Sequence, residues 1–240
     1  MTKKLLAVFA HPDDESFGPG GTLAKYAREG VEIHLLCATR GERRGNKINK
    51  DVKISHIREK ELLEAVKVLG IVRVEFLDFI DGQLCNAIYH QLAGKIIKKI
   101  NEFKPQVVLT SERRGISGHL DHIAVSMTTT YAFLKTKVSQ KLYYNCLLKG
   151  TRDRMRDDYF VYFPEGYPES EITTKIDYTP YWKLKKEAML AHQSQLKDVR
   201  ALLARFTKFP KVDHFILQYH RGVKVSLPEK DIFAGINSPD

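Results

Sequence analysis

The sequence lacks the features that mark several protein classes. It has three cysteines, Cys37, Cys85 and Cys146, which are widely spaced and form no C-x-x-C pair. A disulfide framework is therefore not expected, and a reducing compartment fits. No uninterrupted apolar run approaches the roughly 20 residues of a membrane helix. The apolar stretch after Lys3 and Lys4 is too short for a signal peptide and runs at once into acidic residues. We expect a cytoplasmic protein with no membrane span.

Nucleotide and nucleic-acid signatures are also missing. The glycine-bearing loop at 16–22 has neither the G-x-G-x-x-G pattern nor the Gly-Lys-Ser/Thr ending of a phosphate loop. Acidic residues are outnumbered, with 39 Lys and Arg against 29 Asp and Glu and a net charge of +10. This excess favours anionic partners, but the cations are scattered, and the densest cluster, residues 40–45, has no aromatic side chains for base stacking. We predict a basic solvated surface and no specific nucleic-acid partner.

Short apolar runs alternate with amphipathic helical patterns through the first half of the chain. Strands are predicted at 5–10, 31–37, 72–77 and 106–110. Helical patterns at 22–29, 51–69 and 87–103 separate them, and a further helix begins at 119. This alternation predicts an α/β fold with a doubly wound parallel sheet.

The second half is less regular. A fifth strand is predicted at 141–148, a helix bent near Gln195 at 181–206, and a last strand at 213–219. For residues 149–180, between the fifth strand and this helix, we expect an irregular excursion that includes one hairpin and forms either a lid over the pocket or a subunit contact. The tail after Gly222 is expected to pack loosely. We interpret residues 1–240 as a single domain and leave a homo-oligomer open.

A cluster of chemically active side chains, His11-Pro12-Asp13-Asp14-Glu15, follows the first strand directly. Pro12 ends the strand because it has no N–H. In open α/β sheets the ligand site lies beyond the carboxyl ends of such strands. The cluster therefore leaves the sheet where a site is expected.

The spacing within this cluster predicts a metal centre. Imidazole and carboxylate are common ligands of catalytic zinc, and His11 and Asp14 are close enough for a tight turn to aim both at one ion. Asp13 lies between them and must point elsewhere, which leaves it free to accept a proton from a metal-activated water. A third ligand must come from elsewhere, and the best candidate segment is 119–122, which follows the fourth strand. Asp78 and Asp81 follow the third strand, near the same edge.

The motifs resemble the PIG-L/LmbE-like deacetylase family. The match covers about 195 residues and consists of Ala10-His11-Pro12-Asp13-Asp14-Glu15, Gly21-Thr22-Leu23, Thr39-Arg40-Gly41-Glu42, Arg58-Glu59-Lys60-Glu61, Gly118-His119-Leu120-Asp121-His122 and Ala191-His192-Gln193-Ser194-Gln195. The resemblance implies a Rossmann-like three-layer sandwich with a mainly parallel central sheet. It also implies a zinc-dependent hydrolase that deacetylates N-acetylglucosamine-containing small molecules or glycoconjugates. Leu120 departs from the family pattern, in which many members have proline.

The resemblance also assigns roles to individual residues. The implied zinc ligands are His11, Asp14 and His122, with Asp13 as general base. His119 would stabilise the oxyanion or protonate the leaving amine, with Asp121 orienting it and raising its pKa. Arg58, Glu15 and His192 are assigned to substrate binding. Two imidazoles and a carboxylate also suit iron(II), so Fe²⁺ remains an alternative to Zn²⁺.

Several alternatives stay open at this stage. His119 could replace Asp14 as the third ligand. Asp13 and Glu15 could be carboxylates at a helix N-terminus, and His192 could be a buried helix histidine bonded to backbone. At the level of function, the chain could be an amidase that cleaves a larger thiol-sugar conjugate, or a non-catalytic sugar-binding module.

Overall fold

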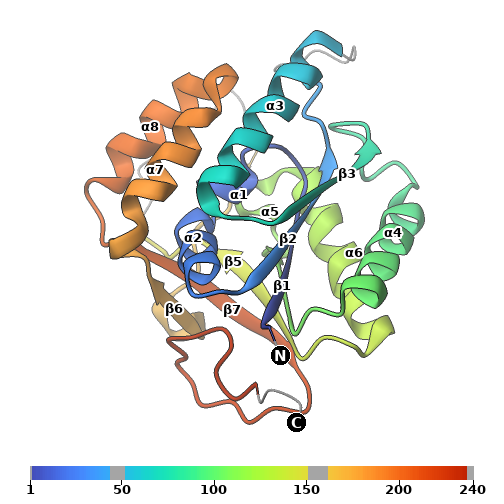
Figure 1. Ribbon diagram of the computed structural model, residues 1–240, viewed down its shortest axis with the longest axis vertical. Coiled ribbons are helices and arrows are strands. Elements are labelled where there is room, and N and C mark those ends of the chain that lie inside the picture. Colours follow the sequence, from blue (N-terminus) through green and yellow to red (C-terminus); the bar gives the residue numbers. More distant parts are fainter. Residues whose placement is uncertain (1, 44–51, 151–161, 237–240) are drawn as a thin grey trace.

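The computed structural model describes residues 2–43, 52–150 and 162–236 (Figure 1). The strands are β1 (Lys4–Phe9), β2 (Glu32–Thr39), β3 (Arg73–Phe79), β4 (Val107–Ser111), β5 (Lys141–Cys146), β6 (Thr174–Asp177) and β7 (Val212–His220). The helices are α1 (Asp14–Phe17), α2 (Gly20–Arg28), α3 (Val52–Leu69), α4 (Tyr89–Phe103), α5 (Gly115–Gly118), α6 (Leu120–Thr136), α7 (Trp182–Ala191) and α8 (Leu196–Phe206). None of these helices combines the length and the apolar composition needed to cross a membrane.

The strands form one sheet in the order β3-β2-β1-β4-β5-β7-β6. Strands β1 to β5 pair in parallel, whereas β7 pairs antiparallel with β5 and with the edge strand β6. Helices cover both faces, with α2, α3 and α7 on one side and α4 and α6 on the other (Figure 1). The predicted α/β sandwich with a mainly parallel sheet is confirmed.

The central strand β1 explains why the first apolar run is continuous. Leu5, Ala7 and Phe9 face the core under α2 and α3, while Leu6 and Val8 face the core under α4 and α6. Because successive side chains of a strand point to opposite faces, a strand buried on both faces needs apolar residues at every position.

The topology places the candidate residues together. The strand order reverses at β1, with β2 on one side and β4 on the other. Val8 of β1 lies beside Thr110 of β4, so the two strands end at the same level. Ligand sites of open α/β sheets lie at such a reversal. The segments after β1 and β4 therefore meet at the carboxyl edge of the sheet.

Two expectations for the second half of the chain are corrected. The tail does not pack loosely, because Ile232 is fully buried and Glu229 and Phe233 are nearly so. The excursion at 149–180 is not irregular throughout, because β6 lies within it and pairs with β7. Its residues 151–161 lie outside the described part of the chain. The bend predicted near Gln195 is confirmed, since α7 ends at Ala191 and α8 begins at Leu196.

Candidate active site

The turn after β1 is held by one of its own carboxylates. The backbone N–H groups of Ala10 and His11 donate to Asp14 Oδ2 at 3.1 and 2.9 Å. Asp13 adopts φ 113°, a left-handed conformation that is costly for a residue with a side chain. This strained turn directs the Asp14 and Asp13 carboxylates to different places, as the spacing of the motif predicted.

Three side chains from two distant segments converge beside this turn. His11 Nδ1 lies 3.1 Å from His122 Nε2, and His122 Nε2 lies 3.3 Å from Asp14 Oδ1. His11 Nδ1 lies 3.9 Å from Asp14 Oδ2. Ligand atoms that share a tetrahedral zinc ion, with bonds of about 2.0–2.1 Å, are roughly 3.3 Å apart. The donor types and their spacing therefore fit a divalent cation.

His119 lies close enough to be considered with these residues. One ligand atom from each of His11, His119 and His122 lies within 4.8 Å of the others. The rings of His11 and His119 have centroids 4.8 Å apart and meet edge to face. His119 therefore lies close enough to both histidines for the alternative ligand set of His11, His119 and His122.

The second nitrogen of His11 is held by two carboxylates. His11 Nε2 lies 3.0 Å from Asp81 Oδ1 and 3.2 Å from Asp121 Oδ2. Asp121 in turn accepts the backbone N–H groups of Gly82 and Leu84 at 2.5 and 3.1 Å. A carboxylate behind a ligating imidazole fixes the ring and increases its basicity. The prediction that Asp121 orients His119 is corrected, since its carboxylate positions His11.

The environment of His119 also differs from expectation. Its Nδ1 accepts the backbone N–H of Asp121 at 3.2 Å, which caps α6. Burial, together with the neighbouring His11 and His122, lowers the pKa of His119 to about 4. Asp121 raises this pKa, as predicted, but burial and the two neighbouring histidines lower it by more. A neutral ring that accepts at Nδ1 carries its hydrogen on Nε2, and it can therefore still donate.

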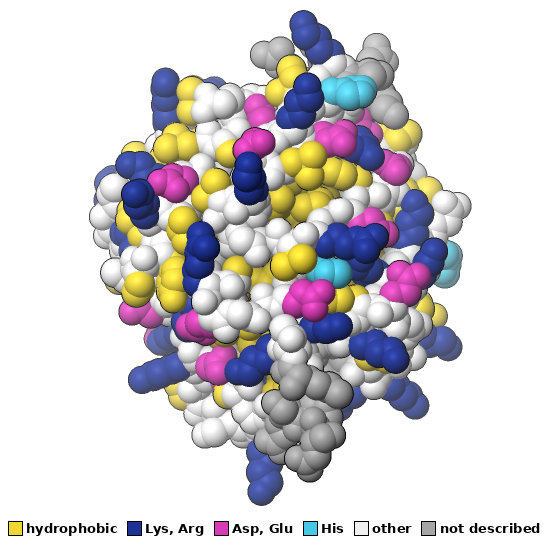
Figure 2. Space-filling view, viewed as in Figure 1, with side chains coloured by type: hydrophobic (Ala, Val, Ile, Leu, Met, Phe, Trp, Pro, Cys, Tyr) yellow, Lys and Arg dark blue, Asp and Glu magenta, His cyan; other side chains and the backbone are white. Residues whose placement is uncertain are grey.

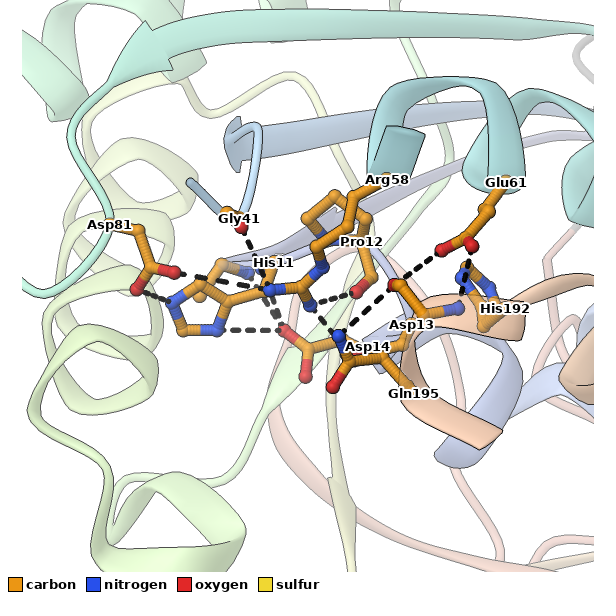
Figure 3. Close-up of polar contacts among 12 residues, drawn as sticks. His11, Pro12, Asp13, Asp14, Gly41, Arg58, Glu61, Asp81, His192 and Gln195 are labelled. Atoms are coloured by element: carbon orange, nitrogen blue, oxygen red, sulfur yellow. Dashed lines mark hydrogen bonds and ion pairs between the residues drawn. The ribbon is translucent and has the colours of Figure 1, made fainter. Parts of the chain in front are cut away.

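Asp13 is paired with the buried guanidinium of Arg58 (Figure 3). Arg58 Nη2 donates to Asp13 Oδ2 at 2.9 Å and to the Pro12 carbonyl at 2.7 Å, while Nη1 donates to the Gly41 carbonyl at 3.1 Å. Burial raises the pKa of Asp13 to about 7 against the opposing effect of Arg58. Arg58 is thus part of the site and does not lie on a solvated helix face.

Behind Asp13 lies a second buried pair, Glu15 and His192. His192 Nε2 lies 2.9 Å from Glu15 Oε1, and both side chains are at most 1% exposed. Glu15 Oε2 accepts the backbone N–H of Asp13 at 3.0 Å. Burial alone would lower the pKa of His192, but the Glu15 carboxylate outweighs it and the pKa is raised. His192 is therefore bonded to a carboxylate and not to backbone, and the pair supports the strained turn from the α7 side.

A cavity of about 400 Å³ opens beside the site between the ends of β2 and β3 and the start of α3. Its lining consists of Arg40, Glu42, Ser55, His56, Glu59, Asp78 and Phe79. Glu42 connects the cavity to the site, because its Oε1 accepts the backbone N–H of Asp81 at 3.2 Å. The Thr39-Arg40-Gly41-Glu42 motif thus contributes to this wall.

Asp81 lies at the centre of the site, although no role was predicted for it from the sequence. Besides holding His11, its carboxylate lies 4.0 Å from Arg58 Nη1. It therefore connects His11 to the arginine that binds Asp13 (Figure 3). Its position after the third strand indicated that Asp81 lies near the site, but it did not indicate contact with His11.

Comparison with known proteins gives consistent matches. The family model described as "PIG-L: GlcNAc-PI de-N-acetylase" matches residues 6–133. A mycothiol S-conjugate amidase of Streptomyces coelicolor is 29% identical, with 97% of this chain and 97% of that protein covered. A 1D-myo-inositol 2-acetamido-2-deoxy-alpha-D-glucopyranoside deacetylase of Rhodococcus jostii is 30% identical, with 81% and 82% covered.

Solved structures show the same fold at low sequence identity. The N,N'-diacetylchitobiose deacetylase of Pyrococcus horikoshii superposes with a TM-score of 0.66 at 19% identity, covering 90% of this chain and 84% of that one. The 4-carboxy-2-hydroxymuconate hydratase GalB of Pseudomonas putida superposes with a TM-score of 0.61 at 18% identity, covering 94% and 100%. Two different reactions thus occur on this fold, so the reaction must be argued from the site.

Proposed function

Because the chain belongs to the PIG-L family of GlcNAc-PI de-N-acetylases, we propose that it is a metal-dependent amide hydrolase. Its substrate would be an N-acetylglucosamine-containing small molecule or glycoconjugate, from which it removes the acetyl group. The observation that carries this proposal is the convergence of His11, Asp14 and His122 next to Asp13, a carboxylate left outside the ligand set.

The proposed cofactor is a single zinc ion held by His11 Nδ1, His122 Nε2 and Asp14. Zinc supports catalysis when three protein ligands leave a fourth position open. Iron(II) accepts the same donors and is the alternative. When bound, such an ion lowers the pKa of water and polarises a carbonyl group.

Asp13 is the proposed general base. Its carboxylate lies outside the ligand set and beside it, and Arg58 fixes its orientation. As water attacks the acetamide carbon, one proton of the water passes to Asp13 and the new C–O bond forms. The C–N bond then breaks, the amine nitrogen takes the proton that Asp13 had accepted, and acetate and the free amino sugar leave.

His119 is proposed as the hydrogen-bond donor to the carbonyl oxygen as negative charge develops there. The Asp121 N–H occupies Nδ1, so the hydrogen of the neutral ring lies on Nε2. A donor already oriented in this way typically contributes about 3–4 kcal/mol to lowering the barrier. Arg58 is proposed to contact substrate hydroxyl groups, and Glu15 and His192 to support the turn that carries Asp13.

A second candidate is an amidase that cleaves a larger thiol-sugar conjugate. The similarity to the Streptomyces coelicolor amidase along nearly the whole chain favours it. The same side chains would serve, because both reactions hydrolyse an amide. The two activities differ in the acid released, which is acetate in the first and a larger acid in the second.

The decisive test is an assay of amine release from a panel of N-acetylglucosamine conjugates and one thiol-sugar conjugate. We expect turnover that a chelator abolishes and added Zn²⁺ or Fe²⁺ restores, with the released acid identifying the reaction. Asp13→Asn is the matched control, since it keeps the ligand set. Turnover that is indifferent to metal removal would refute the proposal, and metal binding without turnover on any amide would favour a sugar-binding module.

A further inference from the structure

The solvent side of α6 is almost entirely apolar. Its exposed side chains are Leu120, Met127, Tyr131, Leu134 and Lys135, the first four being 64, 54, 53 and 45% exposed. The neighbouring helix α4 packs on the same face of the sheet and exposes mostly polar residues. A surface helix normally directs polar residues to water. The outer side of α6 therefore resembles a surface that is covered by a partner.

The apolar surface continues from α6 onto the end of β7. Val138 and Tyr219 are 37 and 38% exposed. Next to them, a hollow of about 350 Å³ is lined by Phe133, Leu134, Lys137, Tyr219, His220 and Arg221. We use the term α6 surface for Leu120, Met127, Tyr131, Leu134, Val138 and Tyr219 together with the cations Lys135, Lys137 and Arg221.

This α6 surface carries charge of one sign. The sequence has no Asp or Glu from His122 to Arg152, and none from His214 to Pro228. Elsewhere the signs are mixed, as the space-filling view shows, with Asp and Glu lying between the Lys and Arg side chains (Figure 2).

Two partners fit an apolar surface, a second copy of this chain and a lipid bilayer, and the charge of the α6 surface distinguishes between them. A two-fold contact with a second copy of this chain would bring together the same patch of both copies, so Lys135, Lys137 and Arg221 of each copy would share one interface. Juxtaposed like charges oppose such a contact. An anionic lipid surface instead attracts the cations and buries the apolar side chains between them.

We propose that the α6 surface docks on anionic lipid bilayers, with α6 lying in the plane of the headgroups. The long stems of Lys135 and Lys137 can keep their ammonium groups among the headgroups while their carbons join the apolar layer. Tyr131 and Tyr219 are of the type enriched at such interfaces. Leu120 stands between His119 and Asp121, so docking would bring the end of α6 that carries His119 near the membrane surface.

The test measures binding of the full chain to sedimented vesicles of phosphatidylcholine, with and without phosphatidylserine. We expect binding to the anionic vesicles that weakens as salt is raised, since surface charges are screened. Removing both cations with Lys135→Gln and Lys137→Gln should weaken it by about fivefold for each charge. Leu134→Gln should also weaken it without changing the far-ultraviolet circular dichroism spectrum.

Matched controls come from α3, on the opposite face of the sheet. Leu63 is exposed to the same extent as Leu134, at 45%, and Lys60 and Lys67 are also exposed. Leu63→Gln and the pair Lys60→Gln with Lys67→Gln should bind vesicles as the unaltered protein does. Equal losses in both sets would show non-specific attraction and overturn the proposal. Absence of vesicle binding, with a dimer that Leu134→Gln dissociates, would also overturn it and assign the α6 surface to self-association.

Discussion

Two buried polar clusters lie at opposite ends of the same sheet, and they are built differently. At the amino end of β5, Lys141 Nζ donates to Glu229 Oε1 at 2.5 Å and to the Ala234 carbonyl at 2.7 Å, while the Tyr143 hydroxyl donates to Glu229. We name Lys141, Tyr143 and Glu229 the tail cluster. Each of their polar side-chain atoms has a partner, so the tail cluster is satisfied internally.

The cluster at the carboxyl end is not satisfied in this way. Among the described residues, Arg58 Nε, His192 Nδ1 and Glu42 Oε2 are buried without a hydrogen-bond partner. Asp13 is also strained, at φ 113°. Proteins tolerate such local inconsistency where function requires it. The comparison indicates that the tail cluster serves stability and the carboxyl-end cluster serves chemistry.

The largest expected effect separates chemistry from stability. Asp13→Asn should lower the rate of amide hydrolysis by at least about a hundredfold, because it removes the proton acceptor. Zinc content measured by atomic absorption should stay the same, since Asp13 lies outside the ligand set. A near-normal rate with normal zinc content would remove Asp13 from the mechanism.

The converse substitution breaks the tail cluster. Glu229→Gln leaves the Lys141 ammonium buried without a counter-charge and should lower the free energy of unfolding by about 3–5 kcal/mol. The rate per folded molecule should be unchanged. Denaturant unfolding measures the loss, with Glu169→Gln as control, because its ion pair with Lys175 is solvent-exposed and should contribute little to stability. Equal losses for both would contradict the assigned role of the tail cluster.

A smaller effect is expected for the carboxylate behind His11. Asp81→Asn should weaken metal affinity by about 10- to 100-fold, the range found when a group supporting a ligand is altered. Competition with a chromogenic chelator measures this change. The exposed Asp78, which pairs with Arg40, is the control, and Asp78→Asn should leave the affinity unchanged. Unaltered affinity in Asp81→Asn would confine Asp81 to its contact with Arg58.

The smallest effect concerns pH. The raised pKa of His192 means that protonating it stabilises the fold, since Glu15 and Asp13 outweigh burial and Arg58. This contribution is complete below the ordinary pKa of about 6.5 and is lost as the pH rises through the raised value. His192→Gln should therefore destabilise the protein more in acid than in alkali. Urea unfolding at both pH values tests this, and a pH-independent difference would exclude the ion pair.

The sequence predicted most of the architecture and the core of the candidate site for identifiable reasons. Periodicity located the first five strands, because β1 to β5 are short apolar runs between amphipathic helices. The turn at His11 to Asp14 followed from residue spacing alone. Edge strand β6 was missed, because Thr174–Asp177 carries little apolar pattern and depends on pairing with β7. The contacts of the Asp81 and Asp121 carboxylates with His11 were not predicted. They depend on the direction of each side chain, which residue spacing does not determine.

The buried tail has a consequence for biosynthesis. Glu229, Ile232 and Phe233 complete a core whose other walls include β1 and β5. During translation, the earlier strands and helices emerge first but lack this last wall until residue 233 has left the ribosome. Nascent chains should therefore remain protease-sensitive until late in elongation, so stalled translation products would be degraded before they could form a working enzyme.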